Sequence, residues 1–267
     1  MTRTFAVTNQ KGGVGKTTTC AALCGAFSAR GGRVLAVDLD PQGNLSFILG
    51  AETDGCLTVH DLFTGAAPVR DIIQHRPTAD VLSSNILLSG AELELTQARR
   101  EYLLREALEE VADDYDYIVI DTPPALSVLT INAYAAATDL IIPMTAEILS
   151  LQGIAQLKDT ILAVRKYYNP ALVLSGILLT RYNRRTLLHR EVEELAGIVA
   201  SQLGTKVFDT KISVSIAIAE SPAHGMTVLT YAPRAKGARD YRRFVRELLG
   251  EPLEEDEIGA AEGSKRN

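Results

Sequence analysis

Tryptophan is absent from this sequence of 267 residues, and cysteine and histidine are scarce. The three cysteines, Cys20, Cys24 and Cys56, form no CxxC pair, which favours a reduced, cytoplasmic protein. The four histidines are scattered along the chain, so no histidine metal cluster is predicted, and no serine–histidine–aspartate arrangement is evident. The chemistry of this protein must therefore rest on other residue types.

Long apolar runs and a positive net charge are also missing. No apolar stretch approaches the roughly 18 residues of a membrane-spanning helix. The opening MTRTFAVTNQ enters a strand-like pattern directly, so no signal peptide is expected. The formal net charge is −6, so contact with DNA would need a local basic patch. In the absence of repeats and linkers we expect one domain over residues 1–250, followed by an acidic, disordered tail over residues 251–267.

Short apolar runs alternate with helix-length segments along most of the chain. The predicted strands are Thr4–Thr8, Arg33–Val37, Asp80–Leu82, Tyr117–Asp121, Leu140–Pro143, Val173–Leu179 and Lys206–Phe208. The predicted helices are Lys16–Arg30, Ala91–Ala112, Leu151–Tyr167, Leu187–Gln202 and Gly237–Leu249. Strands such as YIVID are apolar on both faces, as parallel strands covered on both sides are. The pattern predicts an α/β fold with a doubly wound, mostly parallel sheet flanked by helices on both faces.

A glycine-rich loop lies between the first predicted strand and the first predicted helix. Its glycines allow backbone N–H groups to turn inward around phosphate oxygens. Lys16 is placed to reach the outer phosphates of a nucleotide, and the Thr17 hydroxyl is placed to bind Mg²⁺. The predicted nucleotide-binding residues of this loop are Lys11, Gly12, Gly13, Val14, Gly15, Lys16, Thr17 and Thr18.

The stretch NQKGGVGKTTT departs from the usual phosphate-binding loop in two ways. Gln10 stands where the first glycine of that pattern is expected, and a second lysine, Lys11, lies inside the loop. From its spacing alone, Lys11 is either a solvated charge or a ligand of a facing nucleotide. The loop resembles the deviant Walker A motif of the ParA/MinD superfamily of P-loop ATPases. That resemblance implies that Lys11 and Lys16 are catalytic, and that Lys11 reaches across a dimer interface to the partner's ATP.

Carboxylates follow two of the predicted strands. Asp38 and Asp40 lie two residues apart and share one face of an extended chain, and Asp121 ends the apolar run YIVID. Ligands of such a sheet bind outside the carboxyl ends of its strands, so all three carboxylates should face the phosphates. The resemblance assigns Asp40 to orienting the water that attacks the γ-phosphate. Asp38 and Asp121, together with Thr17, are the predicted magnesium site.

Three further stretches make the resemblance more specific. DLDPQGN, IDTPP and ESPAHG, the last followed by YAPRAKGARDYRR, resemble chromosomal and plasmid partition ATPases of the short, Soj-like ParA form. The likeness covers roughly residues 4–249, and no DNA-reading helix-turn-helix precedes the first strand. It implies an ATP- and Mg²⁺-dependent homodimer that binds DNA without sequence preference. A ParB-like centromere-binding partner would then stimulate hydrolysis and release the dimer.

The stretch before ESPAHG departs from that family. Ser213 and Ser215 stand where proline and asparagine would frame the adenine, and Val214 and Ala217 stand where arginines would touch DNA. Asn183 is a further predicted contact to the base. Two runs of cations offer another DNA surface. The predicted DNA-binding residues are Arg181, Arg184, Arg185, Lys211, Arg234 and Lys236.

Two other functions fit the same scaffold. A MinD-like positioning ATPase would end in a basic amphipathic helix that lies on the membrane. The segment DYRRFVRELLG has an apolar and a basic face, but EPLEEDE follows it, and an anionic membrane would repel that acidic segment, so no membrane partner is expected. A metabolic synthetase would need a small-molecule site and turnover without a partner.

Overall fold

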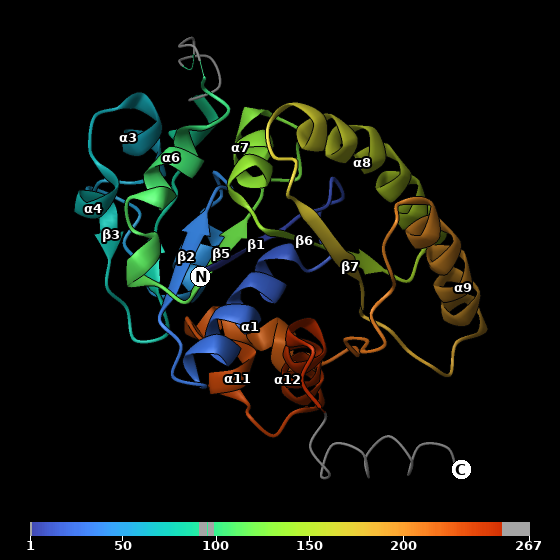
Figure 1. Ribbon diagram of the computed structural model, residues 1–267. Coiled ribbons are helices and arrows are strands. Elements are labelled where there is room, and N and C mark those ends of the chain that lie inside the picture. Colours follow the sequence, from blue (N-terminus) through green and yellow to red (C-terminus); the bar gives the residue numbers. More distant parts are fainter. Residues whose placement is uncertain (1, 91–94, 96–98, 253–267) are drawn as a thin grey trace.

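The computed structural model describes residues 2–90, 95 and 99–252. A seven-stranded sheet lies at its centre, in the order β3-β4-β2-β5-β1-β6-β7 (Figure 1). The strands are β1 (Arg3–Val7), β2 (Val34–Asp38), β3 (Ile73–Gln74), β4 (Asp80–Leu82), β5 (Tyr117–Asp121), β6 (Asp139–Thr145) and β7 (Val173–Thr180). Only the short edge strand β3 runs antiparallel to its neighbour. The predicted mostly parallel α/β sheet is confirmed.

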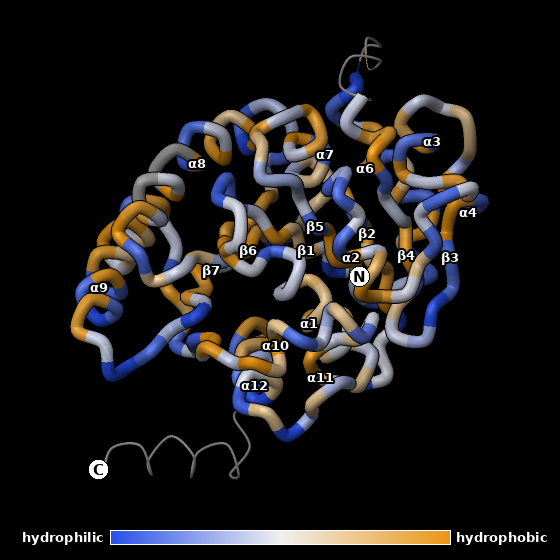
Figure 2. The backbone as a smooth tube through the Cα atoms, turned by 180° about the vertical axis from the view of Figure 1, so that it is seen from behind, coloured by the Kyte–Doolittle hydropathy of each residue, from blue (hydrophilic) through white to orange (hydrophobic). Residues whose placement is uncertain are grey.

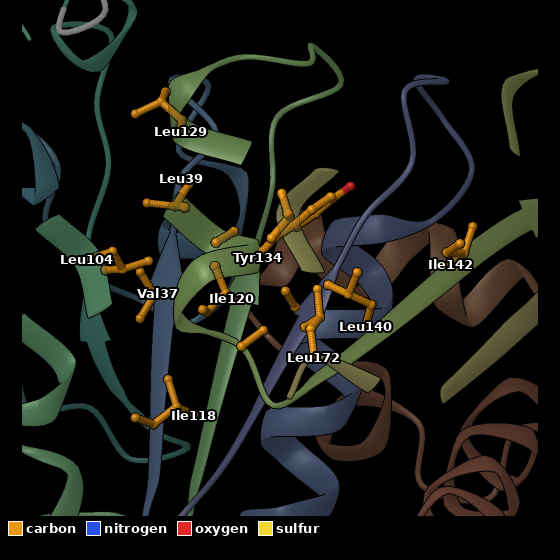
Figure 3. Packing of buried hydrophobic residues seen from close by; sticks show 14 of the residues in the cluster. Val37, Leu39, Leu104, Ile118, Ile120, Leu129, Tyr134, Leu140, Ile142 and Leu172 are labelled. Atoms are coloured by element: carbon orange, nitrogen blue, oxygen red, sulfur yellow. The ribbon is translucent and has the colours of Figure 1, made fainter. Parts of the chain in front are cut away.

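The strands are apolar on both faces because both faces are covered. Alternate residues of a strand point to opposite sides, so Phe5 and Val7 join one hydrophobic cluster while Ala6 joins the other. Figure 3 shows part of the second cluster, in which Val37 of β2 and Ile120 of β5 gather with Tyr134 of α7. The central strands are therefore fixed from both sides.

Helices flank both faces, as a doubly wound sheet requires (Figure 1). One face is covered by α3 (Val59–Thr64), α4 (Val69–Ile72), α6 (Leu103–Glu109), α7 (Val128–Ala136), α8 (Ile148–Tyr167) and α9 (Leu187–Gln202). The other is covered by α1 (Lys16–Ser28), α2 (Asn44–Ile48), α11 (Val228–Tyr231) and α12 (Lys236–Leu249). Short helical turns occur at η1 (Ala112–Asp114), α10 (Ile216–Glu220) and η2 (Ser221–His224).

Two predicted elements are wrong in part. Lys206–Phe208 is not a strand, because only Val207 forms a bridge, to Ile177 of β7. Residues 91–94 and 96–98 of the predicted helix Ala91–Ala112 lie outside the described residues. In the remainder the helix spans only Leu103–Glu109, because Arg99 adopts a left-handed φ of 67° and the chain turns before α6 begins. The side chain of Asn132 accepts a hydrogen bond from the Leu104 N–H at 3.0 Å. It thereby pairs one of the backbone N–H groups that have no partner within the first turn of this helix.

The last described helix packs against the core. Tyr241, Phe244 and Val245 of α12 are at most 1 % exposed, and α12 contacts α1. Beyond it, Glu251 pairs with Arg30 at 2.5 Å. Nearly all of the predicted tail over residues 251–267 lies outside the described residues. Within the described part of the chain, no helix has the length and apolar character needed to cross a membrane.

Candidate nucleotide site

The glycine loop joins β1 to α1 at the carboxyl end of the sheet. Gly13 and Gly15 adopt φ values of 74° and 90°, which disfavour any residue with a side chain. A Cβ atom built on Gly12 or Gly13 would meet no atom of this chain within 4 Å. Internal packing therefore does not require glycine at these two positions. The open space beside them suits the close approach of a ligand such as a phosphate.

Hydrogen bonds to the neighbouring strands β6 and β7 hold the loop in place. Thr180, at the end of β7, donates a hydrogen bond from Oγ1 to the Val14 carbonyl at 2.8 Å. Asn9 donates from Nδ2 to the Pro143 carbonyl of β6 at 2.8 Å and accepts from the Lys11 N–H at 2.9 Å. Sequence reasoning missed Asn9 and Thr180, because nothing in their local pattern shows which strand lies beside the loop.

Lys16 opens α1 and is only 7 % exposed. Its Nζ donates to the Lys11 carbonyl at 3.2 Å and forms no ion pair within the described residues. Burial lowers the pKa of Lys16, against the opposing effect of Asp121 and Asp40. Burying a charged ammonium group without a carboxylate partner costs free energy, and a bound anion would offset this cost. Thr17 and Thr18 follow it in the first turn and are partly exposed.

Asp38 and Asp121 lie side by side, as register partners at the carboxyl ends of β2 and β5. Both are completely buried, and Asp121 forms no ion pair with the described residues, although the Thr17 hydroxyl lies close enough to lower the pKa of Asp121 against the effect of burial. Burial raises the pKa of Asp121, and the charge of Asp38 raises it further. A bound cation would offset the repulsion between these two buried carboxylates. Mg²⁺ fits it, because this ion binds through one or two carboxylates together with nucleotide phosphates and water.

Asp38 has a second task that its sequence pattern did not predict. Its Oδ2 accepts hydrogen bonds from the N–H and the hydroxyl of Ser46, both at 2.8 Å, and its Oδ1 accepts from the Asp40 N–H at 3.1 Å. The Ser46 hydroxyl in turn accepts from the Ser84 N–H at 3.0 Å. Asp38 therefore shapes the loop that carries Asp40, whose own side chain is only partly buried.

Lys11 reaches away from its own loop. Its Nζ lies 2.5 Å from Oε2 of Glu147 and donates to the Ser150 hydroxyl at 3.1 Å. Glu147 is exposed and stands directly before α8, and the hydrogen bond from Lys11 holds the pKa of its carboxyl below the usual range. Glu147 and Ser150 were not predicted, since they lie far from Lys11 along the chain.

Asn183 and Ser213, both predicted adenine contacts, are brought together. Tyr182 and Ser213 form a parallel bridge, with the Tyr182 N–H donating to the Ile212 carbonyl at 2.9 Å. The Asn183 side chain accepts from the Arg185 N–H at 3.1 Å, and its own N–H donates to Nδ1 of His189 at 2.9 Å. Ser215 follows at the N-terminus of α10.

The predicted DNA-binding cations fall into two groups. Arg181, Arg184 and Arg185 are exposed on the loop between β7 and α9, which is the deep blue stretch of tube between these elements in Figure 2. Lys211 is brought next to this loop by the bridge at Ser213, and its side chain is 12 % exposed. The other group, Arg234 and Lys236, is exposed around the start of α12.

Comparisons with known proteins agree with this geometry. A family model described as an AAA domain matches residues 2–174. The chain is 43 % identical to the chromosome partitioning protein ParA of Caulobacter vibrioides, over 92 % of this chain and 94 % of the relative. It is 41 % identical to the sporulation initiation inhibitor protein Soj of Bacillus subtilis, over 93 % and 98 %.

A solved structure provides a further comparison. It is described as cobyrinic acid a,c-diamide synthase from Mycobacterium smegmatis with bound ADP and magnesium. It is 39 % identical to this chain, with a TM-score of 0.81, and the match covers 93 % of this chain and 94 % of that one. The similarity thus extends across nearly the whole of each protein.

Proposed function

This chain belongs to the ParA/Soj family of partition ATPases, and we propose that it acts as an ATP-driven switch in the partition of a plasmid or chromosome. It hydrolyses ATP, with Mg²⁺ as the metal cofactor. The observation that carries the proposal is the buried Asp121, which forms no ion pair with the described residues, beside an open glycine loop with a lysine at each end. Residues 1–250 form the proposed ATPase domain.

The proposed nucleotide contacts follow from the positions of the side chains. Backbone N–H groups of residues 12–16 surround the phosphates, while Lys16 neutralises them from within the fold. Asp121 and the Thr17 hydroxyl hold the metal, which neutralises charge that develops on the phosphate oxygens. Asp38 supports this site mainly by holding the Asp40 loop. Asn183, Ser213 and Ser215 line the side on which the base would lie.

Hydrolysis depends on positioning and electrostatics. Asp40 is the proposed group that orients water toward the terminal phosphate, because its backbone is fixed by Asp38 while its side chain remains partly exposed. None of the loop contacts described above involves an arginine side chain that could stabilise the charge that develops on the phosphate during hydrolysis. Basal turnover should therefore be slow, well below the ~1–100 s⁻¹ of kinases.

Dimerisation would supply a second lysine. The Lys11 side chain points away from its own phosphate loop and pairs with the exposed Glu147. Exposed aliphatic side chains occur in the segments that follow β5 and β6 and beside Ser213: Leu126, Ile148, Leu149, Val214 and Ile216 are 47 to 75 % exposed. Exposed apolar side chains of this size favour burial against another protein surface where they lie together. A second copy facing the first would cover them and receive Lys11 at its nucleotide.

The dimer is the proposed DNA-binding form, released when a ParB-like partner stimulates hydrolysis. The chain carries a net charge of −6, so its DNA contacts must lie in the local basic runs, and pairing doubles each run. Phosphate contacts of this kind ignore base sequence and weaken steeply with salt. ATP-bound protein would accordingly gather on the nucleoid.

The sequence is also compatible with two other functions. The MinD-like alternative loses support, because the apolar face of α12 is buried against the core. A small-molecule synthetase remains a second candidate, favoured by the description of the 39 % identical structure as a diamide synthase. Appreciable ATP turnover without DNA or a partner protein would favour that enzyme over the partition switch.

Two substitutions test the proposed switch. Lys11→Ala should bind ATP as a monomer and fail to dimerise, whereas Asp40→Ala should bind ATP and accumulate as a dimer. Light scattering with Mg²⁺ and ATP measures the mass, and isothermal titration measures nucleotide binding. Lys16→Ala serves as the reference that loses nucleotide affinity. A Lys11→Ala protein that dimerises like the wild type contradicts the proposed exchange of lysines.

A further inference from the structure

A pocket lies at the end of the sheet opposite the glycine loop. It is bordered by Val34 and Asp80, the first residues of β2 and β4, whereas the glycine loop and Asp121 lie at the carboxyl ends of the strands. Its volume is about 530 Å³, and α4 and β3, which lie side by side in Figure 1 and Figure 2, contribute to its wall. This volume is typical of sites that hold small molecules. The pocket is therefore a candidate site that the proposed ATPase does not use.

Hydrogen bonds and ion pairs hold the acidic side chains of the pocket. Asp80 accepts a hydrogen bond from the Tyr115 hydroxyl at 2.7 Å, and its other carboxylate oxygen lies 2.9 Å from Nδ1 of His75. Tyr115 is buried, and burial together with its bond to Asp80 raises the pKa of its hydroxyl. Asp114 pairs with Arg70 at 2.9 Å. Both carboxylates that line the pocket therefore already have partners.

Three arginines line the same pocket, and they differ in how their charge is compensated. Arg70 pairs with Asp114, and Arg33 pairs with Asp116 at 3.1 Å. Arg76 forms no ion pair with any residue that the structure describes. The positive charge of Arg76 is thus the one that these carboxylates leave without a partner.

A neutral side chain holds Arg76 in place. One terminal nitrogen of its guanidinium donates to Oε1 of Gln74 at 2.8 Å. Gln74 is itself fixed, because its amide accepts from the Glu52 N–H at 2.8 Å, donates to the Glu52 carbonyl at 2.9 Å and donates to the Ser83 hydroxyl at 2.9 Å. Nε of Arg76 is buried and has no acceptor among the described residues. A guanidinium that is held in this way, with charge and donors that the chain does not match, is suited to bind an oxyanion.

We propose that this pocket binds a small molecule that carries one oxyanion group, a carboxylate or a phosphate, on a partly apolar body, with Arg76 as its charged ligand. One such group matches the one arginine of the pocket that lacks a carboxylate partner. A guanidinium donates two parallel hydrogen bonds to either kind of group. Val34, Ile73 and Pro77 line the pocket as well and offer contact to the apolar body. Because the pocket and the glycine loop lie at opposite ends of the strands, this ligand and ATP would bind at the same time.

The test titrates benzoate and phenyl phosphate into the full chain, with the neutral benzamide as reference, and measures binding by isothermal titration. A non-hydrolysable ATP analogue and Mg²⁺ are present throughout, so the glycine loop is filled and does not take the phosphate probe. At least one of the two anions should bind more tightly than benzamide. Arg76→Gln should weaken that binding about 10- to 150-fold, because it removes hydrogen bonds to a charged group.

Arg33→Gln is the matched control. It removes the same charge from the same pocket, but Arg33 is already paired with the exposed Asp116, so the affinity should change by at most about five-fold. Nitrogen-15 NMR of the arginine Nε–H groups gives a second readout that needs no variant to bind. The Arg76 signal, assigned by its absence in Arg76→Gln, should shift when the anion is added to the wild type.

The outcomes decide between a defined site and a general attraction of anions. Binding of benzoate alone identifies the natural ligand as a carboxylate, binding of phenyl phosphate alone identifies it as a phosphate, and either result supports the site. The proposal is overturned if neither anion binds at up to about 10 mM, or if benzamide binds as tightly as they do. An equal loss in Arg33→Gln, or an Arg76 signal that does not move, also overturns it. None of these results involves ATP hydrolysis or DNA, so the proposed function is tested separately.

Discussion

Replacing Glu147 by glutamine should strengthen ATP-dependent dimerisation. In the single chain, Glu147 holds the Lys11 ammonium at 2.5 Å, and the two side chains are 57 % and 35 % exposed. If Lys11 must cross to a partner, this contact has to break first in both protomers. Glu147 would then act as a competitor for the lysine that dimerisation needs, and Glu147→Gln weakens the competitor without removing its bulk.

The size of the effect follows from the exposure of the pair. Exposed ion pairs contribute about 0.2–1 kcal/mol, so releasing two of them favours the dimer by about 0.4–2 kcal/mol. This corresponds to a dimer dissociation constant about 2- to 30-fold lower. Sedimentation equilibrium with a non-hydrolysable ATP analogue at low salt measures it, and the gain should shrink as salt screens the pair.

A matched control removes a comparable exposed carboxylate elsewhere. Glu109→Gln disrupts the ion pair with Arg105 on α6, far from the nucleotide loop in sequence, and should leave dimerisation unchanged. The reasoning is refuted if Glu147→Gln dimerises no more tightly than the wild type. It is also refuted if Glu109→Gln shows the same gain, because a general loss of negative charge would then explain both.

Two further predictions concern the buried carboxylates. Burial raises the pKa values of Asp38 and Asp121, so the nucleotide-free folded state retains protons that the unfolded chain releases. Its free energy of unfolding should fall as the pH rises from about 4 through the raised values, and thermal melts should show a flatter fall in Asp121→Asn; parallel curves would contradict this. Ser46→Ala leaves the buried Ser84 N–H unpaired, which should cost about 1–3 kcal/mol in denaturant unfolding. Because Asp38 also holds the Asp40 N–H, kcat for ATP should fall more than nucleotide affinity, and unchanged kcat would argue against this role.

The central sheet was predictable because its signals are local. The run YIVID is apolar up to its final aspartate, and the structure buries Ile118, Val119 and Ile120 of this run between two layers of helices. Strand–helix alternation then leaves few arrangements for a parallel sheet. The ends of the elements were less predictable, and α8 begins at Ile148, three residues before its predicted start.

The wrong elements show where local signals fail. Lys206–Phe208 has the composition of a strand, but Phe208 packs on Gly176 and Phe244 instead of extending the sheet. Strand β3 is only two residues long and carries no periodicity. Helix α6 begins late because Arg99 reverses the chain, and a left-handed arginine has no sequence signature.

In the candidate site, too, residues in local motifs were predictable and residues with distant contacts were not. Glycines, Lys16, Asp40 and Asp121 occur in short motifs whose spacing reflects the shape of one loop or strand end. The residues that hold them, such as Asn9, Thr180 and Ser46, contact partners on other elements or loops and therefore have no local pattern. Their roles depend on the strand order, which the sequence leaves open.

The proposed pairing of two protomers also explains how an acidic chain can be given an ATP-controlled affinity for DNA. With a net charge of −6, one protomer offers DNA only its local basic runs, on the loop between β7 and α9 and at the start of α12. One phosphate contact contributes a salt slope of only about 0.9, whereas a rigid pair of protomers contributes about 1.8 from the same side chains. The nucleotide need not create a new DNA surface. It has only to hold two copies together, and hydrolysis that separates the copies would return each protomer to weak DNA binding.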